Sequence, residues 1–184
     1  MALANYAASG LSEKTAYLEL HKYGEMNHWK KPNEKGYFED FKIHYYPNFK
    51  QEQIPILLNL GYEKIIMDFG DEYSVYREEI LRCDRKIFLL NLNPWQKFAA
   101  EKTAEDLQKK EWGNIHPIYA SVNAQNIIKK EIEKKYGIQI MEIPFIKNPR
   151  LLQAEDFFCM DFILGQSAAK VKKRKSLIPI REKK

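Results

Sequence analysis

The stretch Tyr62-Glu63-Lys64-Ile65-Ile66-Met67-Asp68-Phe69-Gly70 decides the fold class of this chain. It is a short apolar run that ends in a carboxylate followed by a glycine. Such a run is typical of a buried β-strand that carries its acid to the carboxyl edge of a sheet. Five other runs also have strand character, and they cover residues 15–20, 41–46, 86–92, 117–122 and 138–143.

Helical patterns fill the intervals between these strands, over residues 53–59, 74–83, 96–112, 124–136 and 151–164. Strand–helix alternation of this kind predicts a three-layer α/β/α fold with a mostly parallel sheet. Ser74 is a plausible N-cap of its helix, and residues 21–36 have the polar composition of a long surface loop. Trp95 and Trp112 are predicted to pack in the interior.

Length and charge suggest one α/β domain over residues 1–166 and a basic, flexible tail over residues 167–184. The 184 residues are 45% hydrophobic, which is a globular composition. The chain has neither a secretory signal nor an apolar run of membrane-spanning length, so a cytoplasmic location is expected. Residues 170–184 contain eight basic residues and one acid. This segment is predicted to stay solvated or to contact an anionic membrane or nucleic acid weakly.

The carboxyl ends of the predicted strands are the first place to look for a ligand site. Asp68 could serve Mg²⁺, because hard cations take oxygen ligands directly or through water, and Gly70 would let the backbone approach a phosphate. The alternative is that Asp68 is solvated or caps a helix. Asn123 follows another strand and suits either a ligand contact or an N-cap. The Pro144–Asn148 turn follows the last strand, where a structural role is the alternative.

The order of these segments resembles the MinD/ParA-type ATPases of the SIMIBI class. Ala2-Leu3-Ala4-Asn5-Tyr6-Ala7-Ala8 followed by residues 14–20 is similar to the helix and strand that come after the family's phosphate loop. Residues 62–70 resemble the Walker B strand of the family, and residues 82–90 resemble the strand after it. The likeness covers about residues 2 to 165 and is greatest to the divergent branch associated with pilus assembly and chromosome partitioning.

The resemblance implies a bacterial ATPase that uses ATP and Mg²⁺. Asp68 would be the Mg²⁺-associated acid, with Gly70 and Glu19 beside it. Asn123 and Pro144 would lie near the base. The resemblance also implies a homodimer or a protein partner, and a location in the cytoplasm or at the inner face of the membrane.

The departures from the family limit this expectation. No GxxxxGK[ST] segment occurs in the 184 residues, so the phosphate loop and the first strand of the family are missing from them. His21 also stands where a second acid is usual. Either Met1 is an internal start of a longer protein, which the abrupt beginning of the likeness favours, or the chain is a relative that lost the chemistry. No catalytic residue is predicted.

Two other functions remain open at this stage. One is a non-catalytic adaptor that binds a protein partner or an anionic surface through the α/β scaffold and the basic tail. The other is an unrelated doubly wound binding module of the flavodoxin-like kind. ATP and Mg²⁺ are the expected cofactors if the full-length protein has a phosphate loop, and none is expected for these 184 residues alone.

Overall fold

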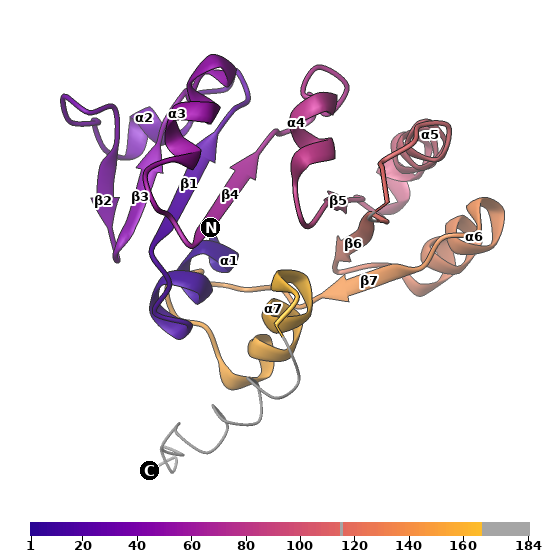
Figure 1. Cartoon of the computed structure of the whole chain (residues 1–184). Coiled ribbons are helices and arrows are strands. Elements are labelled where there is room, and N and C mark those ends of the chain that lie inside the picture. The colour runs from indigo at the N-terminus through magenta and orange to yellow at the C-terminus, as the bar shows by residue number, and fades with distance from the viewer. Residues whose placement is uncertain (115, 167–184) are drawn as a thin grey trace, which may run out of the picture. The chain divides into compact units, whose positions relative to one another are not determined.

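The computed structural model describes residues 1–114 and 116–166, which divide into two compact units. The first unit consists of Met1–Ile80 and Ile146–Leu152, and the second of Leu81–Phe145 together with the segment that starts at Gln153. Both are mixtures of helices and mostly parallel strands (Figure 1). The prediction of one domain over residues 1–166 stays a prediction. No helix in the described ranges is both long and apolar enough to cross a membrane.

The first unit is built on a four-stranded sheet with the order β2-β3-β1-β4. β1 is parallel to both β3 and β4, and only β2 runs antiparallel, paired with β3. All five residues of β1 are buried, as expected for the central strand of a sheet covered on both faces. The strands are β1 (Thr15–Glu19), β2 (Phe38–Asp40), β3 (Ile43–Tyr46) and β4 (Lys64–Asp68).

Helical segments cover both faces of this sheet, so the first unit has the three-layer arrangement by itself. One face packs Tyr17 and Tyr45 against Ala4 and Ala8, which lie on α1 (Ala2–Asn5) and the π-helical turn η1 (Tyr6–Gly10), and also against Met26. The other face packs its alternate strand residues against α3 (Ile54–Leu58), which follows the 3-10 turn η2 (Gln51–Gln53). Met26 begins the short helix α2 (Met26–Trp29).

Arg150 joins the segment Ile146–Leu152 to the rest of the first unit. Its guanidinium pairs with the Asp40 carboxylate at the end of β2, with 2.5 Å between Nη2 and Oδ2. The same guanidinium lies 4.9 Å from the ring centroid of Trp29 and 4.8 Å from that of Phe41. A planar cation close to two aromatic rings gains cation–π attraction in addition to the ion pair.

The second unit contains a three-stranded, fully parallel sheet with the order β5-β6-β7. Parallel neighbours require crossover connections, and two helices supply them. The strands are β5 (Ile87–Leu89), β6 (Ile118–Val122) and β7 (Ile140–Ile143). The other elements are α4 (Arg77–Arg82), which crosses the boundary between the units, η3 (Pro94–Gln96), α5 (Lys97–Gln108), α6 (Asn126–Tyr136), η4 (Ala154–Asp156) and α7 (Phe157–Leu164).

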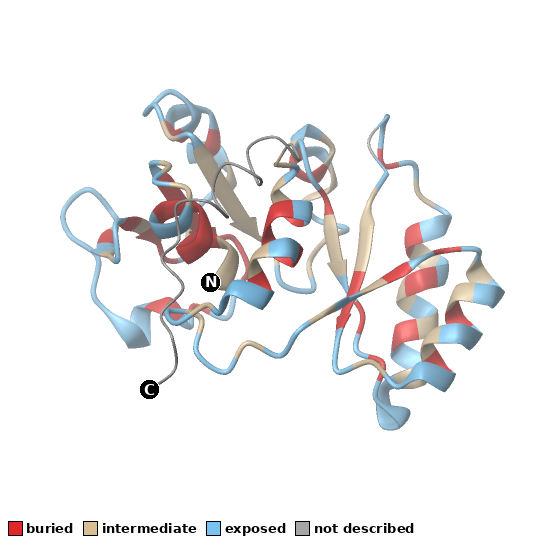
Figure 2. Ribbon diagram, turned by 90° about the horizontal axis from the view of Figure 1, so that it is seen from below, coloured by how far each residue is buried: buried red, intermediate tan, exposed pale blue. Residues whose placement is uncertain are grey.

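The two crossover helices, α5 and α6, bury their apolar stripes against one face of this sheet. Ala100 and Ala104 of α5 and Ile128 and Ile132 of α6 form a core with residues of the strands. Figure 2 shows the alternation of buried and exposed residues along both helices. Ion pairs join the helices along their length, between Lys97 and Glu131 and between Lys135 and Glu101. Gly137 ends α6 with a φ of 62°, a left-handed conformation that glycine adopts readily.

All six predicted strands are present, and β2 is an additional strand, which begins just after the loop predicted for residues 21–36. Two local predictions were wrong. α4 begins at Arg77, three residues after the proposed cap Ser74. Trp95 is 95% exposed, because it lies on the 3-10 turn before α5 and faces away from the core, whereas Trp112 is 5% exposed, as predicted.

Two isoleucines of α6 test how the second unit is held together. Ile132 is fully buried, whereas Ile127 on the same helix is 74% exposed. Replacing Ile132 by Ala should lower the free energy of unfolding by about 2–5 kcal/mol, because it leaves a cavity in the core. The matched change Ile127→Ala should stay within about 0.5 kcal/mol of the parent. Urea denaturation followed by circular dichroism measures both values, and equal losses would contradict the packing described above.

Candidate functional site

Two acids meet where β1 and β4 end. The strands are parallel, and their register places Glu19 directly beside Asp68. Two carboxylates at the carboxyl edge of a parallel sheet occupy the position where ligands bind in open α/β folds. The first unit therefore has its candidate site at this edge, and the hydrogen bonds of the two acids decide what it can do.

Both oxygens of Asp68 accept hydrogen bonds from the protein. The Tyr17 hydroxyl donates to Oδ2 over 2.5 Å, and the Gly70 backbone N–H donates to Oδ1 over 3.0 Å. Burial raises the pKa of Tyr17, and the negative charge of Asp68 raises it further. Tyr17 therefore stays protonated and remains a donor to the carboxylate at all physiological pH values.

Glu19 is more deeply buried than Asp68, and both of its oxygens also accept hydrogen bonds from the protein. It is 1% exposed, and its two oxygens accept the backbone N–H groups of Met26 and Asn48, each over 3.1 Å. Its Oε1 also lies 4.0 Å from Nε2 of His21. A buried carboxylate needs such donors, since an unpaired one is costly. Glu19 thus fixes α2 and the loop after β3 to the end of β1, and its predicted role in nucleotide binding stays a prediction.

Position 70 requires glycine for two reasons, its backbone conformation and the close approach of His21. Its φ is +56°, and a Cβ built at this position would lie 2.9 Å from the Cβ of His21. A side chain here would therefore be both strained and blocked. His21 is itself buried, and its Nδ1 has no hydrogen-bond partner within the described ranges. The close approach explains the glycine by packing, and a phosphate contact of Gly70 stays a prediction.

Asp68 also acts on the Met1 amino group, which precedes α1. Burial lowers the pKa of this amino group, and the Asp68 carboxylate acts against that shift.

The other two predicted contacts, Asn123 and Pro144, belong to the second unit. Asn123 follows β6 with a φ of 54°, and the N-cap of α6 is Gln125. The interpretation of Asn123 as an N-cap was therefore wrong, because two further residues precede the helix. Pro144 follows β7 directly. A ligand role for either residue stays a prediction.

The residues of the first unit do not by themselves fit Mg²⁺ and ATP. The described residues contain no group of three or more His, Cys, Asp or Glu side chains that could hold a metal ion. The oxygens of Asp68 and Glu19 already accept hydrogens from the protein. No phosphate-binding loop sequence occurs among the 184 residues either. Asp68 can still accept a hydrogen from a metal-bound water.

Tyr17 is the residue at this site that sequence reasoning missed. It lies two residues before Glu19 on β1, so its side chain is on the same face of the sheet as that of Glu19. The pairing of Glu19 with Asp68 then brings the long Tyr17 side chain within reach of Asp68. A prediction that had paired the first and third predicted core strands could have found this contact.

Comparisons with solved structures identify proteins of similar fold. The chain aligns with the MinD cell division protein of Aquifex aeolicus at a TM-score of 0.51 and 14% identity, covering 100% of this chain and 92% of that one. It aligns with a ParA family ATPase from Chlorobium tepidum TLS at a TM-score of 0.51 and 19% identity, covering 92% and 85%. No protein-family model and no curated protein sequence matches the chain.

The hydrogen bond between Tyr17 and Asp68 can be tested with two tyrosine variants. Tyr17→Phe leaves a half-buried carboxylate oxygen without its donor and should cost about 1–3 kcal/mol of unfolding free energy. Tyr23→Phe removes a similar bond to Asp71, but at an exposed site, and should cost less than about 0.5 kcal/mol. Chemical denaturation at pH 7 gives both numbers. If Tyr17→Phe leaves the free energy of unfolding unchanged, Asp68 does not depend on this donor.

Proposed function

Since the chain has the fold of MinD and ParA-family ATPases, we propose that it is a partitioning- or positioning-type domain whose 184 residues do not hydrolyse ATP alone. The proposal rests on the hydrogen bonds that Asp68 already makes within the protein. It stands at the Walker B-like strand end, yet Tyr17 and Gly70 already bond its two oxygens. Catalysis of phosphoryl transfer needs a preformed grip on the phosphates, which clustered backbone N–H groups and a lysine provide in P-loop proteins.

ATP and Mg²⁺ are the ligands proposed for this fold where a phosphate loop is present. In such a protein Asp68 would face the Mg²⁺ through water, and Glu19 and Gly70 would support that edge. Asn123 and Pro144 would contact the base, as the family resemblance implies. These assignments rest on the order of the strands and on the resemblance, and the activity is proposed by the same reasoning.

Nucleotide binding by this chain can be measured directly. Titration with a fluorescent ATP analogue in Mg²⁺ should give a dissociation constant weaker than about 1 mM, because no loop grips the phosphates. Asp68→Asn should leave this weak signal unchanged, and Asp71→Asn serves as a control for the loss of one negative charge. Micromolar binding that Asp68→Asn abolishes would overturn the proposal.

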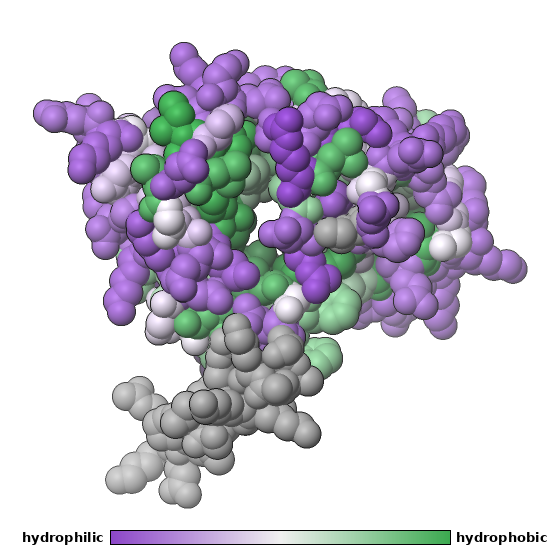
Figure 3. Space-filling view, viewed as in Figure 1, coloured by the Kyte–Doolittle hydropathy of each residue, from purple (hydrophilic) through white to green (hydrophobic). Residues whose placement is uncertain are grey.

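Exposed aromatic side chains favour a second candidate function, that of an adaptor for a protein partner. Trp95 on η3 is 95% exposed, and Phe98 in the first turn of α5 is 81% exposed. Figure 3 shows apolar side chains that interrupt a mostly hydrophilic face. Large aromatics cost little side-chain entropy on binding and often anchor interfaces. A homodimer or a heterologous partner would both use such anchors.

The basic segment Lys170–Lys184 is proposed to add a weak contact with anionic lipid or nucleic acid, at the inner face of the membrane or in the cytoplasm. These residues lie outside the described ranges, so the proposal rests on their charge alone. Each basic residue near an anionic bilayer contributes roughly 1 kcal/mol.

Deleting residues 170–184 tests this contact. The deletion should abolish salt-sensitive sedimentation of the protein with vesicles of anionic lipid, and also salt-sensitive retention on duplex DNA. Vesicles of zwitterionic lipid provide the matched control and should bind neither form. Sedimentation that survives the deletion would assign the contact to the α/β units instead.

A further inference from the structure

Three large apolar side chains of the second unit are exposed around one ion pair. The pair joins Lys97, the first residue of α5, to Glu131 of α6. Trp95 lies two residues before Lys97, and Phe98 comes directly after it. Ile127 lies one helical turn before Glu131 and is 74% exposed. The three apolar side chains therefore surround the same point, at the start of two neighbouring helices.

Phe98 begins an outward-facing stripe of α5 that continues with a lysine. The side of α5 that packs on the sheet is marked by Ala100 and Ala104. With 3.6 residues per turn, Phe98 and Lys102 lie almost half a turn away from these alanines and one turn away from each other. Both side chains are exposed. The solvent side of α5 thus carries an aromatic ring followed by a positive charge.

A similar stripe runs along α6. Ile127 is followed after three and seven residues by Lys130 and Lys134, a spacing that places all three on one side of the helix. This side is turned away from Ile128 and Ile132, which pack in the core. Figure 2 shows both helices with exposed residues on the side opposite the buried ones. The ion pairs between α5 and α6 hold the two stripes side by side.

The lysines of the two stripes have no acid to balance them. Lys102, Lys130 and Lys134 make no ion pair or hydrogen bond within residues 1–114 and 116–166. The acids of α5 and α6 are all engaged, four with lysines and one with the backbone N–H of Ile140; they are Glu101, Glu105, Asp106, Glu131 and Glu133. A partner that brings carboxylates is therefore attracted to this surface, whereas a second copy would bring the same lysines and be repelled.

We propose that the outer surface of α5 and α6 binds an acidic amphipathic segment of another protein. Apolar side chains of that segment would cover Trp95, Phe98 and Ile127, and its carboxylates would face the lysines. Buried aromatics commonly anchor an interface, and complementary charges around them give orientation and specificity. This assignment narrows the adaptor function, on which it rests, to one surface and one class of partner.

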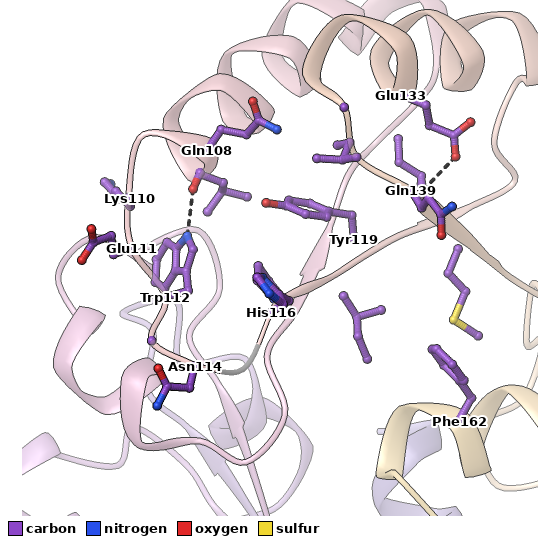
Figure 4. A pocket seen from close by; sticks show the side chains of 18 residues that line it. Gln108, Lys110, Glu111, Trp112, Asn114, His116, Tyr119, Glu133, Gln139 and Phe162 are labelled. Atoms are coloured by element: carbon purple, nitrogen blue, oxygen red, sulfur yellow. Dashed lines mark hydrogen bonds between the residues drawn. The ribbon is translucent and has the colours of Figure 1, made fainter.

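A synthetic helix-forming peptide of about 18 residues is the first probe, with leucines on one face and glutamates on the other. A fluorescent label reports its binding by anisotropy. With unlabelled peptide, the emission of Trp95 should shift to the blue as its ring leaves water. Trp112 should not contribute, because it is already buried and its Nε1–H donates to the Leu107 carbonyl over 2.9 Å (Figure 4).

Four substitutions test the two stripes. Trp95→Ala and Phe98→Ala should each weaken binding of the acidic peptide by about tenfold, which is typical of anchor residues. Lys102→Glu and Lys134→Glu should each weaken it by about threefold or more, because an attraction becomes a repulsion. All four side chains are exposed, so the thermal midpoint should not change.

Matched controls change similar groups elsewhere. Phe158→Ala removes a 77% exposed ring from α7 of the same unit, and Lys31→Glu makes the same change of net charge in the first unit. Neither should alter the affinity. Deleting residues 170–184 should leave the blue shift of Trp95 in place. Loss of that shift would assign the acidic peptide to the basic segment and overturn the proposal.

A second peptide, with lysine in place of each glutamate, separates this proposal from the adaptor function. It should bind at least about tenfold more weakly than the acidic peptide. Equal affinity for both peptides, or no saturable binding of the acidic one up to about 100 µM, would overturn the proposal. Equal affinity that still falls in Trp95→Ala and Phe98→Ala would leave the adaptor function standing. Binding that neither alanine variant weakens would contradict both.

Vesicles of anionic lipid are the rival probe. They should sediment Trp95→Ala and Lys102→Glu as well as they sediment the parent chain, because a protein segment and not a membrane is the proposed occupant. Sedimentation that these two variants abolish would assign the surface to a membrane and overturn the proposal.

Discussion

The parallel pairing of β1 with β4 is the constraint on which the candidate site depends. β1 is buried on both faces, so its polar end residue must find partners inside the protein. The register places Glu19 beside Asp68, and two neighbouring carboxylates repel each other unless donors surround them. Tyr17, Gly70 and the backbone N–H groups of the adjacent loops supply those donors. The local fold of the first unit follows from this requirement.

The sequence predicted the strands well because apolar runs bounded by polar turns are a strong signal. It missed β2, since Phe38–Asp40 is only three residues long and two of the three are acidic. It also misjudged Trp95 and Ser74. Hydrophobicity alone does not say which face of a 3-10 turn points outward, and a serine near a helix does not fix its first residue. Both errors concern helix starts, where one residue changes the direction of a side chain by about 100°.

The sequence predicted the position of the candidate site but not the hydrogen-bond partners of its carboxylates. The order of strands is enough to place Asp68, Glu19 and Gly70 at one edge, because parallel strands end together. The partners of the two acids come from residues that are distant in sequence, such as Tyr17 for Asp68 and Asn48 for Glu19. Such contacts depend on register and loop paths, which residue patterns do not encode.

The hydrogen bonds of Glu19 and Asp68 bear on what this edge of the sheet can bind. A donor that replaces the backbone N–H of Met26 or Asn48 at Glu19 leaves that N–H unpaired, at a cost of about 1–3 kcal/mol. The same holds at Asp68 for the Tyr17 hydroxyl and the Gly70 N–H. A ligand at this edge must therefore keep these hydrogen bonds or replace them, because the two carboxylates also help to hold the fold.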